Sequence, residues 1–332
     1  MKKLFALLLT FSLLAALLAG CGSTGSDTEE ENTPPVEAVT VRLGGLKGPT
    51  SMGMVKLLAD NEAGQTMNHY EFTMAGSADQ LTPQLLQGEL DILAVPVNLG
   101  SVLYNNTEVG VQMLAVNTLG VTYIVEKGGE TVTDWESLRG QTIYATGKGS
   151  TPEYALNYLL TENGIDPTAD VTSEWKSEPT EIVALMAAQD HVIAMMPQPF
   201  VTAAQDKFDS LHIALDMTES WNELGSGSQL CTAGLIARTA FLEEHPEAVA
   251  AFLEEYAAST AYVNENVAEA AKLVERFDIV AAAVAERAIP FCNIVCYTGG
   301  EMTTAVEGFF QVLFDQNPQA LGGKLPGEDF YY

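Results

Sequence analysis

Strands that alternate with helical segments are the feature that most constrains the fold of this chain. Four stretches with the pattern of β-strands follow one another at 39–46, 69–75, 88–97 and 111–116, and helical patterns lie between them. Small polar residues and glycines follow each stretch. This order predicts an α/β sheet of parallel strands, whose carboxyl ends meet at one edge where such sheets bind ligands.

The first unit, residues 39–58, combines a strand, a glycine-rich loop and the start of a helix. We expect Thr50 or Ser51 to cap that helix, because a hydroxyl oxygen there can accept a free backbone N–H group. A helix N-terminus carries unpaired N–H groups and partial positive charge, which suits an anionic ligand group. Taken alone, the stretch fits an ordinary turn as well as a binding loop.

A second series of the same kind begins after an apolar stretch at 121–125. A strand at 142–145 leads into the glycine-rich loop 146–154. Ser150 or Thr151 is expected to cap the helix that follows. This loop has the same design as the one at residues 47–51, so two similar loops are predicted in two separate parts of the chain.

Two more units complete this series. A helix at 181–186 precedes a strand at 191–196, which stops at Pro197-Gln198-Pro199. That corner either faces a cleft or merely ends the strand. A strand at 211–215 follows, and the stretch 221–229 is predicted to be a loop that crosses between domains.

The last third of the chain is predicted to be helical after a strand at 231–236. Apolar residues recur there every three or four positions, which predicts helices that pack one face against a sheet. We interpret these faces as core and not as cofactor sites. The expected helices are 246–263, 267–277, 279–288 and 302–313.

The charge of the chain excludes one class of partner. The 332 residues carry a formal net charge of -29 with only 15 Lys and Arg, so no basic surface for nucleic acid is expected. Hydrophobic residues make up 47% of the chain, which is typical of a folded protein with a sizeable core. The acidic residues are scattered and predict a solvated surface.

The first residues are typical of an export signal. Two lysines precede an apolar run over 4–18, which is too short to span a bilayer comfortably. The sequence Leu-Ala-Gly-Cys at 18–21 resembles the bacterial lipobox, so we expect residues 1–20 to be a lipoprotein signal peptide and Cys21 to be lipidated. Residues 21–37 are polar and are predicted to be a flexible linker.

Cysteine and histidine spacing gives no sign of a metal site or an enzyme nucleophile. Beyond Cys21 there are Cys231, Cys292 and Cys296, which allow at most one disulfide and fit buried free thiols better. No pair among them has the spacing of a zinc site. The Gly-x-Ser-x-Gly motif of hydrolases does not occur.

Four motifs in this order resemble a known family. Behind the lipobox and the polar linker, they are similar to those of the substrate-binding lipoproteins of bacterial ABC importers, in the nitrate, sulfonate, taurine and thiamine-precursor branch. The resemblance runs over about residues 40–315. The motifs are LRGQTI at 138–143, GKGST at 147–151, LLTENGI at 159–165 and HPEAV at 245–249, which leads into Phe252 and Leu253.

The resemblance implies an α/β fold of the type II periplasmic-binding class. Each of two lobes would be a mostly parallel sheet flanked by helices, with two hinge crossings between the lobes. Lobe I would comprise residues 38–123 and 231–332, and lobe II residues 124–230. The restart near Val125 and the Gly-Ser segment near Gly227 fall where the crossings should lie.

The resemblance also implies a role in transport without catalysis. A small solute would bind between the lobes, the lobes would close by hinge bending, and the closed form would deliver the solute to a membrane permease with its ATPase. The protein would be a monomer on the extracytoplasmic face of the cell membrane, anchored through Cys21. No cofactor, metal or nucleic acid is expected.

The expected ligand-binding residues are those at strand ends that would face the cleft. Helix N-termini at the two loops suit a sulfonate, carboxylate or nitrate group, to which Lys47 and Lys148 could add charge. Met52, Tyr123, Tyr154 and Trp221 instead suit a flat heterocycle. The candidates are Lys47, Thr50, Ser51, Met52, Gly76, Ser77, Asn98, Asn117 and Thr118 from lobe I, and Gly149, Ser150, Thr151, Tyr154, Pro197 and Gln198 from lobe II.

Two other functions share part of this pattern. A lipoprotein that senses a ligand and signals to a membrane partner would have every feature named so far. A relative of the pyrimidine synthase of thiamine biosynthesis would be an enzyme, but the cysteine-rich motif of that class is missing, and residues 291–296 (FCNIVC) are only a faint match.

Overall fold

The computed structural model describes residues 38–225 and 227–332. Residues 38–332 form one compact unit. The predicted signal peptide 1–20, the lipidation site Cys21 and the linker 21–37 lie outside the described residues. No helix within the described part of the chain has the length and apolar character needed to cross a membrane.

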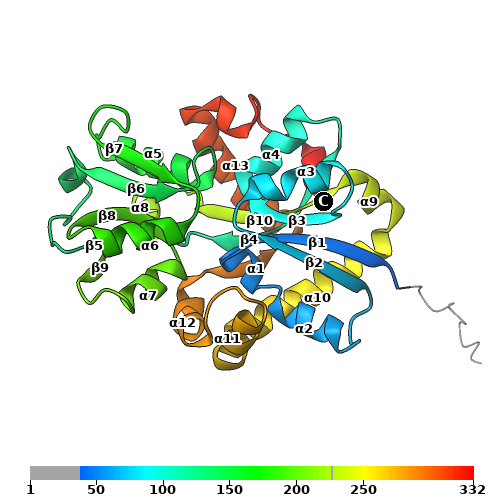
Figure 1. Cartoon of the computed structure of the whole chain (residues 1–332). Helices are drawn as coiled ribbons and strands as arrows, with labels where there is room; N and C mark the ends of the chain where they lie inside the picture. Colours follow the sequence, from blue (N-terminus) through cyan, green and yellow to red (C-terminus); the bar gives the residue numbers. More distant parts are fainter. Residues whose placement is uncertain (1–37, 226) are drawn as a thin grey trace, which may run out of the picture. The chain divides into compact units, whose positions relative to one another are not determined.

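The first sheet has six strands in the order β11-β4-β10-β3-β1-β2 (Figure 1). Strands β1 and β2 are parallel in register from Thr40 opposite His69 to Leu46 opposite Ala75, so their carboxyl ends lie at the same edge. The strands are β1 Thr40–Leu46, β2 His69–Ala75, β3 Ile92–Pro96, β4 Val111–Leu119, β10 Cys231–Arg238 and β11 Ile294–Tyr297.

The second sheet has five strands in the order β7-β6-β8-β5-β9, drawn in green at the left of Figure 1. Strands β6 and β8 are parallel, whereas β5 runs antiparallel to both of its neighbours. The strands are β5 Thr122–Lys127, β6 Thr142–Thr146, β7 Thr172–Lys176, β8 Val192–Pro197 and β9 Leu211–Asp216.

The α/β fold with two sheets flanked by helices is therefore confirmed. Both sheets are mixed, because β5, β10 and β11 run against the other strands. The reversed strands β5 and β10 are also the ones that begin directly after the chain passes from one sheet to the other. It passes at Gly120–Val121 and returns through residues 224–230.

The helices cover both faces of the sheets. Pro246–Glu265 (α10) buries the predicted stripe, with Val249, Phe252, Tyr256 and Val263 all inaccessible to solvent. The other helices are α1 Pro49–Met52, α2 Val55–Glu62, α3 Thr82–Leu86, α4 Val97–Asn106, α5 Thr151–Glu162, α6 Pro179–Ala188, α7 Phe200–Gln205, α8 Met217–Glu223, α9 Thr239–Glu244, α11 Val267–Arg276, α12 Ala282–Ala288 and α13 Gly299–Gln316, with short 3₁₀ turns η1 Ala78–Gln80, η2 Glu136–Leu138, η3 Ile289–Phe291, η4 Pro318–Leu321 and η5 Glu328–Phe330.

One hydrophobic core extends across the two sheets. It contains Leu93 and Val116 of the first sheet together with Ile143 and Ile193 of the second. The indole of Trp221 on α8 lies 4.7 Å from the Tyr158 ring on α5 and 5.4 Å from the Phe309 ring on α13, measured between ring centroids. These aromatic contacts join helices of the second sheet to a helix of the first.

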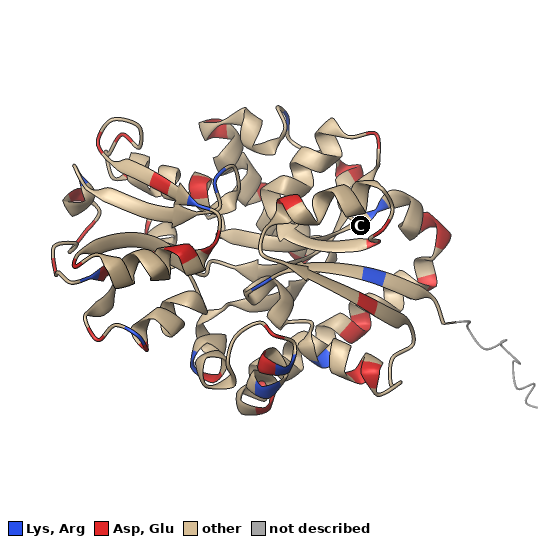
Figure 2. Cartoon of the chain, in the orientation of Figure 1, with Lys and Arg blue, Asp and Glu red and all other residues tan. Residues whose placement is uncertain are grey.

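Acidic residues are spread over many elements rather than gathered in one region (Figure 2). Most are exposed, which agrees with the predicted solvated surface. Cys231 and Cys292 are buried free thiols, and Cys296 is a half-buried free thiol. Burial raises the pKa of the Cys231 thiol to about 12, so it is protonated and unreactive at neutral pH.

Glu126 is a fully buried carboxylate near the end of β5. It accepts hydrogen bonds from Thr131 N (2.9 Å), Thr131 Oγ1 (2.7 Å) and Val132 N (2.9 Å), and it lies 2.7 Å from His191 Nε2. Burial alone would raise its pKa, but these hydrogen bonds outweigh burial and lower the pKa from 4.5 to about 2. Glu126 is therefore charged in the folded protein, and its hydrogen bonds to Thr131 and Val132 stabilise the loop 128–132.

We expect Glu126→Gln to lower the free energy of unfolding by about 2 to 3 kcal/mol at pH 7, because a buried charge-assisted hydrogen-bond network is broken. Because the folded-state pKa is depressed, this stabilisation is present above pH 4.5 and is lost as the pH falls toward 2. Urea unfolding at pH 7 and pH 3 measures it. The exposed Glu130→Gln is the control, and an equal loss at both pH values would contradict the assignment.

Candidate functional site

Asn98 is the point at which the predicted site residues of the two sheets meet. Its side chain is 1% exposed in the first turn of α4. The amide Nδ2 donates to Ala320 O at 3.1 Å and to Gly149 O at 3.5 Å, and Oδ1 accepts from Thr151 Oγ1 at 3.1 Å. The structure thus brings Asn98, Gly149 and Thr151 together although they belong to different sheets.

The loop after β1 is capped differently from the sequence-based expectation. Gly48, with φ 133°, is the N-cap of α1, and Pro49 follows it at the first helical position. Thr50 Oγ1 and Ser51 Oγ instead donate to Leu46 O, at 2.8 and 2.7 Å. The prediction that Thr50 or Ser51 caps this helix is wrong, because both hydroxyls satisfy the last carbonyl of the strand.

Asn117 and Thr118 support this turn from β4 below it. Asn117 Nδ2 donates to Thr50 O at 3.0 Å, and Thr118 Oγ1 donates to Asn117 Oδ1 at 3.1 Å. Both residues are inaccessible to solvent. Met52 is also buried and packs in a cluster with residues of α11 and α12. These side chains hold the loop in this conformation, and direct contact with a solute stays a prediction for them.

Gly76 and Ser77 lie at the end of β2, beside the end of β1. Lys47 N donates to Ala75 O at 2.9 Å, so the pairing of β1 and β2 continues to the edge of the sheet where both strands end. We call this edge the rim. A Cβ atom at Gly76 would lie 3.0 Å from Cδ of Glu178, at the N-terminus of α6, and closer still to its Oε1. Sequence reasoning missed Glu178, although Glu-Pro-Thr-Glu at 178–181 has the pattern of a helix start.

In the second loop Ser150 occupies the N-cap position of α5, as expected, but its side chain accepts no helix N–H group. Its Oγ instead donates to Gly147 O at 2.7 Å. Gly149 N donates to Glu153 Oε2 at 2.5 Å. Tyr154 is half-buried in the same helix turn, and burial followed by the charge of Glu153 raises its pKa. The Tyr154 hydroxyl is therefore neutral and available as a hydrogen-bond donor.

The corner at Pro197 and Gln198 belongs to the crossing between the sheets. Pro197 is opposite Thr122 of β5, and Gln198 N donates to Val121 O at 2.9 Å. Gln198 Oε1 accepts from Thr202 Oγ1 at 2.8 Å, so this oxygen already has a hydrogen-bond partner in α7. Phe200 of α7 approaches the loop after β1, with its Cε2 4.0 Å from a Cβ built on Gly48. Sequence reasoning did not single out Phe200.

Every arginine of the chain is paired with a carboxylate. Arg42 and Arg238 share Asp91, and Arg139 contacts Glu136 and Asp170. Arg276 pairs with Glu62, and Arg287 pairs with Asp206. Lys47 differs, because its Nζ lies 3.7 Å from Asp278, whose side chain is 98% exposed. Lys47 is thus a cation at the end of β1 that a solute could engage with little competition, and Lys148 in the second loop is exposed.

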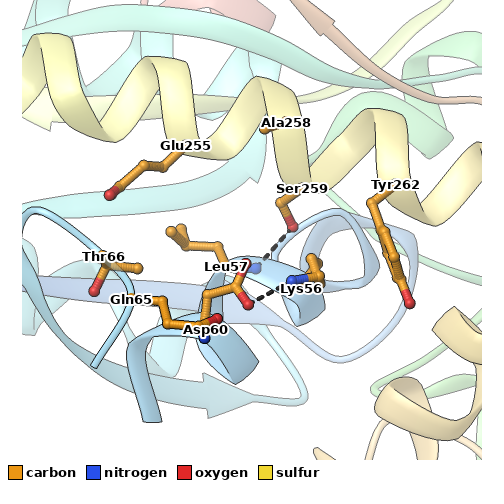
Figure 3. Close-up of a pocket in the computed structure, with 9 residues that line it drawn as sticks. All are labelled: Lys56, Leu57, Asp60, Gln65, Thr66, Glu255, Ala258, Ser259 and Tyr262. Carbon is orange, nitrogen blue, oxygen red and sulfur yellow. Dashed lines mark hydrogen bonds and ion pairs between the residues drawn. The ribbon is translucent and has the colours of Figure 1, made fainter. Parts of the chain in front are cut away.

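A cavity of about 300 Å³ lies elsewhere, between α2 and α10 (Figure 3). Several of its polar groups are already partnered: Lys56 pairs with Asp60, Ser259 Oγ accepts from Leu57 N at 3.0 Å, and Glu255 accepts from Tyr70 Oη at 2.5 Å. None of the predicted site residues lines it. We therefore place the candidate site at the facing strand ends and not in this cavity.

No group of three or more His, Cys, Asp or Glu side chains within residues 38–225 and 227–332 could hold a metal ion. His191 and His212 flank Glu126, and the His245 ring packs 5.3 Å from the Phe241 ring. Each of these histidines has a structural environment away from the strand-end loops.

Solved structures with the same fold cover most of the chain. One is an ABC transporter protein from Parabacteroides distasonis, with 22% identity and a TM-score of 0.72 over 89% of this chain and 99% of that one. The aliphatic sulphonate binding protein SsuA of Escherichia coli has 15% identity and a TM-score of 0.69 over 86% and 94%. The nitrate-binding protein NrtA of Synechocystis has 15% and 0.59 over 80% and 75%.

Sequence comparison gives the family. Curated proteins provide no significant match to this chain. The model of the NMT1-like family matches residues 52–277, which is about two thirds of the chain. This range includes the end of the first loop and the whole second sheet. The chain therefore belongs to the NMT1-like family.

Proposed function

We propose that the protein is the solute-binding component of an ABC importer, which captures a small organic solute between its two sheets and delivers it to a membrane permease. The observation that carries the proposal is the meeting of two strand-end loops, through Asn98 and Thr151, from sheets that the chain crosses twice. Such an arrangement can close around a ligand by hinge bending. The similar structures, named for ABC transport and for sulfonate and nitrate binding, support the same role.

The solute is a small anion such as a sulfonate or carboxylate, or a heteroaromatic compound such as a vitamin precursor. Since all arginines are engaged with carboxylates, an anionic solute would be held by Lys47 and by hydrogen bonds from backbone and hydroxyl groups. The neutral Tyr154 hydroxyl and its ring suit a flat solute. Both classes fit a binding role, in which no covalent bond changes.

We place the protein on the extracytoplasmic face of the cell membrane. The predicted signal peptide and the lipidation of Cys21 support this location, because diacylglycerol on that residue would tether the domain through residues 21–37. Delivery of the solute then requires only encounter with a permease in the same membrane.

A thermal-shift screen of the purified protein tests the proposal, with nitrate, short alkanesulfonates, carboxylates and aminopyrimidines as probes. A solute at a hundred times its Kd should add about 2.7 kcal/mol to the free energy of unfolding. That corresponds to a rise in Tm of about 4 °C for a folded unit of this size. Turnover of a probe, together with no shift from any of them, would contradict the importer role.

For an anionic solute, we expect Lys47→Met to weaken binding about tenfold or more, because one charge-assisted hydrogen bond is lost. Isothermal titration with the best anion from the screen measures the change. The control is Lys324→Met, which removes an exposed lysine near the C-terminus. Equal affinities of the two variants would exclude Lys47 from the site.

A further inference from the structure

The two sheets contact each other differently at the two edges of their interface. At one edge, shown at the top of Figure 1, α5 lies against α13 and α4. The Trp221 ring is inaccessible to solvent between the rings of Tyr158 and Phe309. The hydrogen bond from Thr151 to Asn98 is buried at the same edge. Separating the sheets here would expose large aromatic surface and two polar groups.

The other edge is held by sparse and partly exposed contacts. Helices α7 and α12 meet at the bottom of Figure 1, where Arg287 pairs with Asp206. Both of these side chains are about half exposed, at 53% and 42%, so the ion pair contributes little stability. Phe200 faces Gly48, and Glu178 faces Gly76. This edge can part without exposing a core.

Gly76 owes its identity to the approach of Glu178 and not to its backbone conformation. Its φ is outside the positive region, so a larger residue would meet no backbone strain. A Cβ atom there would instead lie 3.0 Å from Glu178 Cδ and 3.6 Å from Cγ. The backbone of Glu178 is held at this place, because Glu178 is the N-cap of α6 and its N–H donates to Glu181 Oε1.

Hydrogen bonds at the start of α6 fix the main chain of Glu178. Glu181 Oε1 accepts from Glu178 N at 3.2 Å and from Ser177 N at 3.1 Å, and Thr180 Oγ1 lies 3.4 Å from Glu178 Oε2. Moving this segment would leave the N–H groups of Ser177 and Glu178 unpaired. Helix α6 therefore presents a firm surface to the backbone of Gly76.

We propose that the contact of Glu178 with Gly76 is the stop that fixes how far the two sheets close, and that the sheets part at this edge while the α5–α13 edge stays packed. The proposal rests on the solute-binding role, because a stop matters only if the sheets move. It identifies Gly76 and Glu178 as positioning residues of the closed state. Neither needs to touch the solute.

Pulsed EPR distances between paired spin labels test the proposal on the full chain without added solute. One pair, Asp79→Cys with Ala184→Cys, spans the gap between the end of β2 and α6, and the other, Glu162→Cys with Gln311→Cys, spans the packed edge; all four positions are exposed. Cys21 and Cys296 are replaced by Ser. We expect a broad or divided distribution for the rim pair and a single narrow distance for the packed pair.

The Gly76→Leu variant should lose the shortest rim distance and keep the packed-edge distance. Adding Glu178→Ala to Gly76→Leu should restore the short distance, because it removes the opposing side chain. Gly300→Leu is the matched control, since no atom lies within 4 Å of a Cβ built there. An unchanged short distance in Gly76→Leu, or equally narrow distributions for both label pairs, would overturn the proposal.

The two proposals fail in different ways. Because no solute is present in the EPR measurement, a screen without any binding solute would contradict the importer role and leave the distances informative. A solute that binds while Gly76→Leu behaves like the control would retain the importer role and remove the stop.

Discussion

Replacing Asp91 by Ala should lower the free energy of unfolding by about 3 to 5 kcal/mol, because it leaves two partly buried guanidinium groups without their partner. Asp91 is 1% exposed just before β3. Its carboxylate accepts from Arg42 Nε at 2.8 Å, Arg42 Nη2 at 2.6 Å and Arg238 Nη2 at 2.5 Å. These bonds join β1, β3 and the end of β10.

The pH dependence of this effect separates electrostatics from packing. Burial opposes ionisation of Asp91, but the hydrogen bonds from Arg42 and Arg238 outweigh it and lower the pKa. The stabilisation is therefore present above the unfolded-state pKa, near 3.9, and is lost as the pH falls through the lower folded-state pKa. Guanidinium chloride unfolding from pH 3 to 7 measures this, with the exposed Asp79→Ala as control. A destabilisation that does not shrink at acid pH would contradict the ion-pair origin.

Replacing Trp221 by Ala should cost about 3 to 5 kcal/mol, the range for deleting a large buried aromatic side chain. The indole is inaccessible to solvent and contacts Tyr158 and Phe309. Its Nε1 donates to Ser228 Oγ at 3.0 Å and Ser228 O at 3.2 Å, which fixes the returning crossing against α8. The loss would therefore loosen the packed edge as well as the core.

Two comparisons make this prediction specific. Trp221→Phe keeps most of the ring contacts and should be much less destabilised than Trp221→Ala, and Ile213→Ala removes an apolar side chain that is 39% exposed. Thermal unfolding of the three variants ranks them. In the EPR assay, Trp221→Ala should also broaden the packed-edge distance between positions 162 and 311. A loss below about 1 kcal/mol, the size typical of an average substitution, would show that the core does not depend on this ring.

Strands and long helices were predictable because their signals are local and repeated. The predicted strand 69–75 is β2, and the predicted helix 267–277 is α11 to within one residue. Alternation marks the first, and apolar residues every three or four positions mark the second. The succession of such units was enough to give the α/β class.

Short helices within loops were not predicted, because a loop composition hides them. Trp221 lies in α8 and not in the loop expected over 221–229. Asp216 could have indicated the start of α8 in the sequence, because Asp is a common N-cap residue. In the structure its Oδ1 accepts from Thr218 N at 2.8 Å and from Glu219 N at 3.1 Å. Asn98 was likewise expected just past a strand and is in the first turn of α4.

The contacts that assemble the candidate site depend on tertiary structure. Asn98 and Thr151 are 53 residues apart in sequence, and Gly76 and Glu178 are further apart still. Each residue carries a recognisable local pattern, but nothing local indicates its partner. The start of α1 is another case in which local sequence was not sufficient. Thr50 and Ser51 are residue types that often cap helices, but in the structure both hydroxyls donate to Leu46 O at the end of β1.

The order of strands along the chain also sets the order in which the two sheets can be completed during synthesis. The second sheet has all its strands once residue 216 has been added, whereas the first lacks β10 until residue 238 and β11 until residue 297. At 5 to 20 residues per second, the interval of about 22 residues between positions 216 and 238 lasts roughly 1 to 4 s. During that time β3 and β4 lack β10, the strand that will lie between them, so their backbone edges remain open to mispairing.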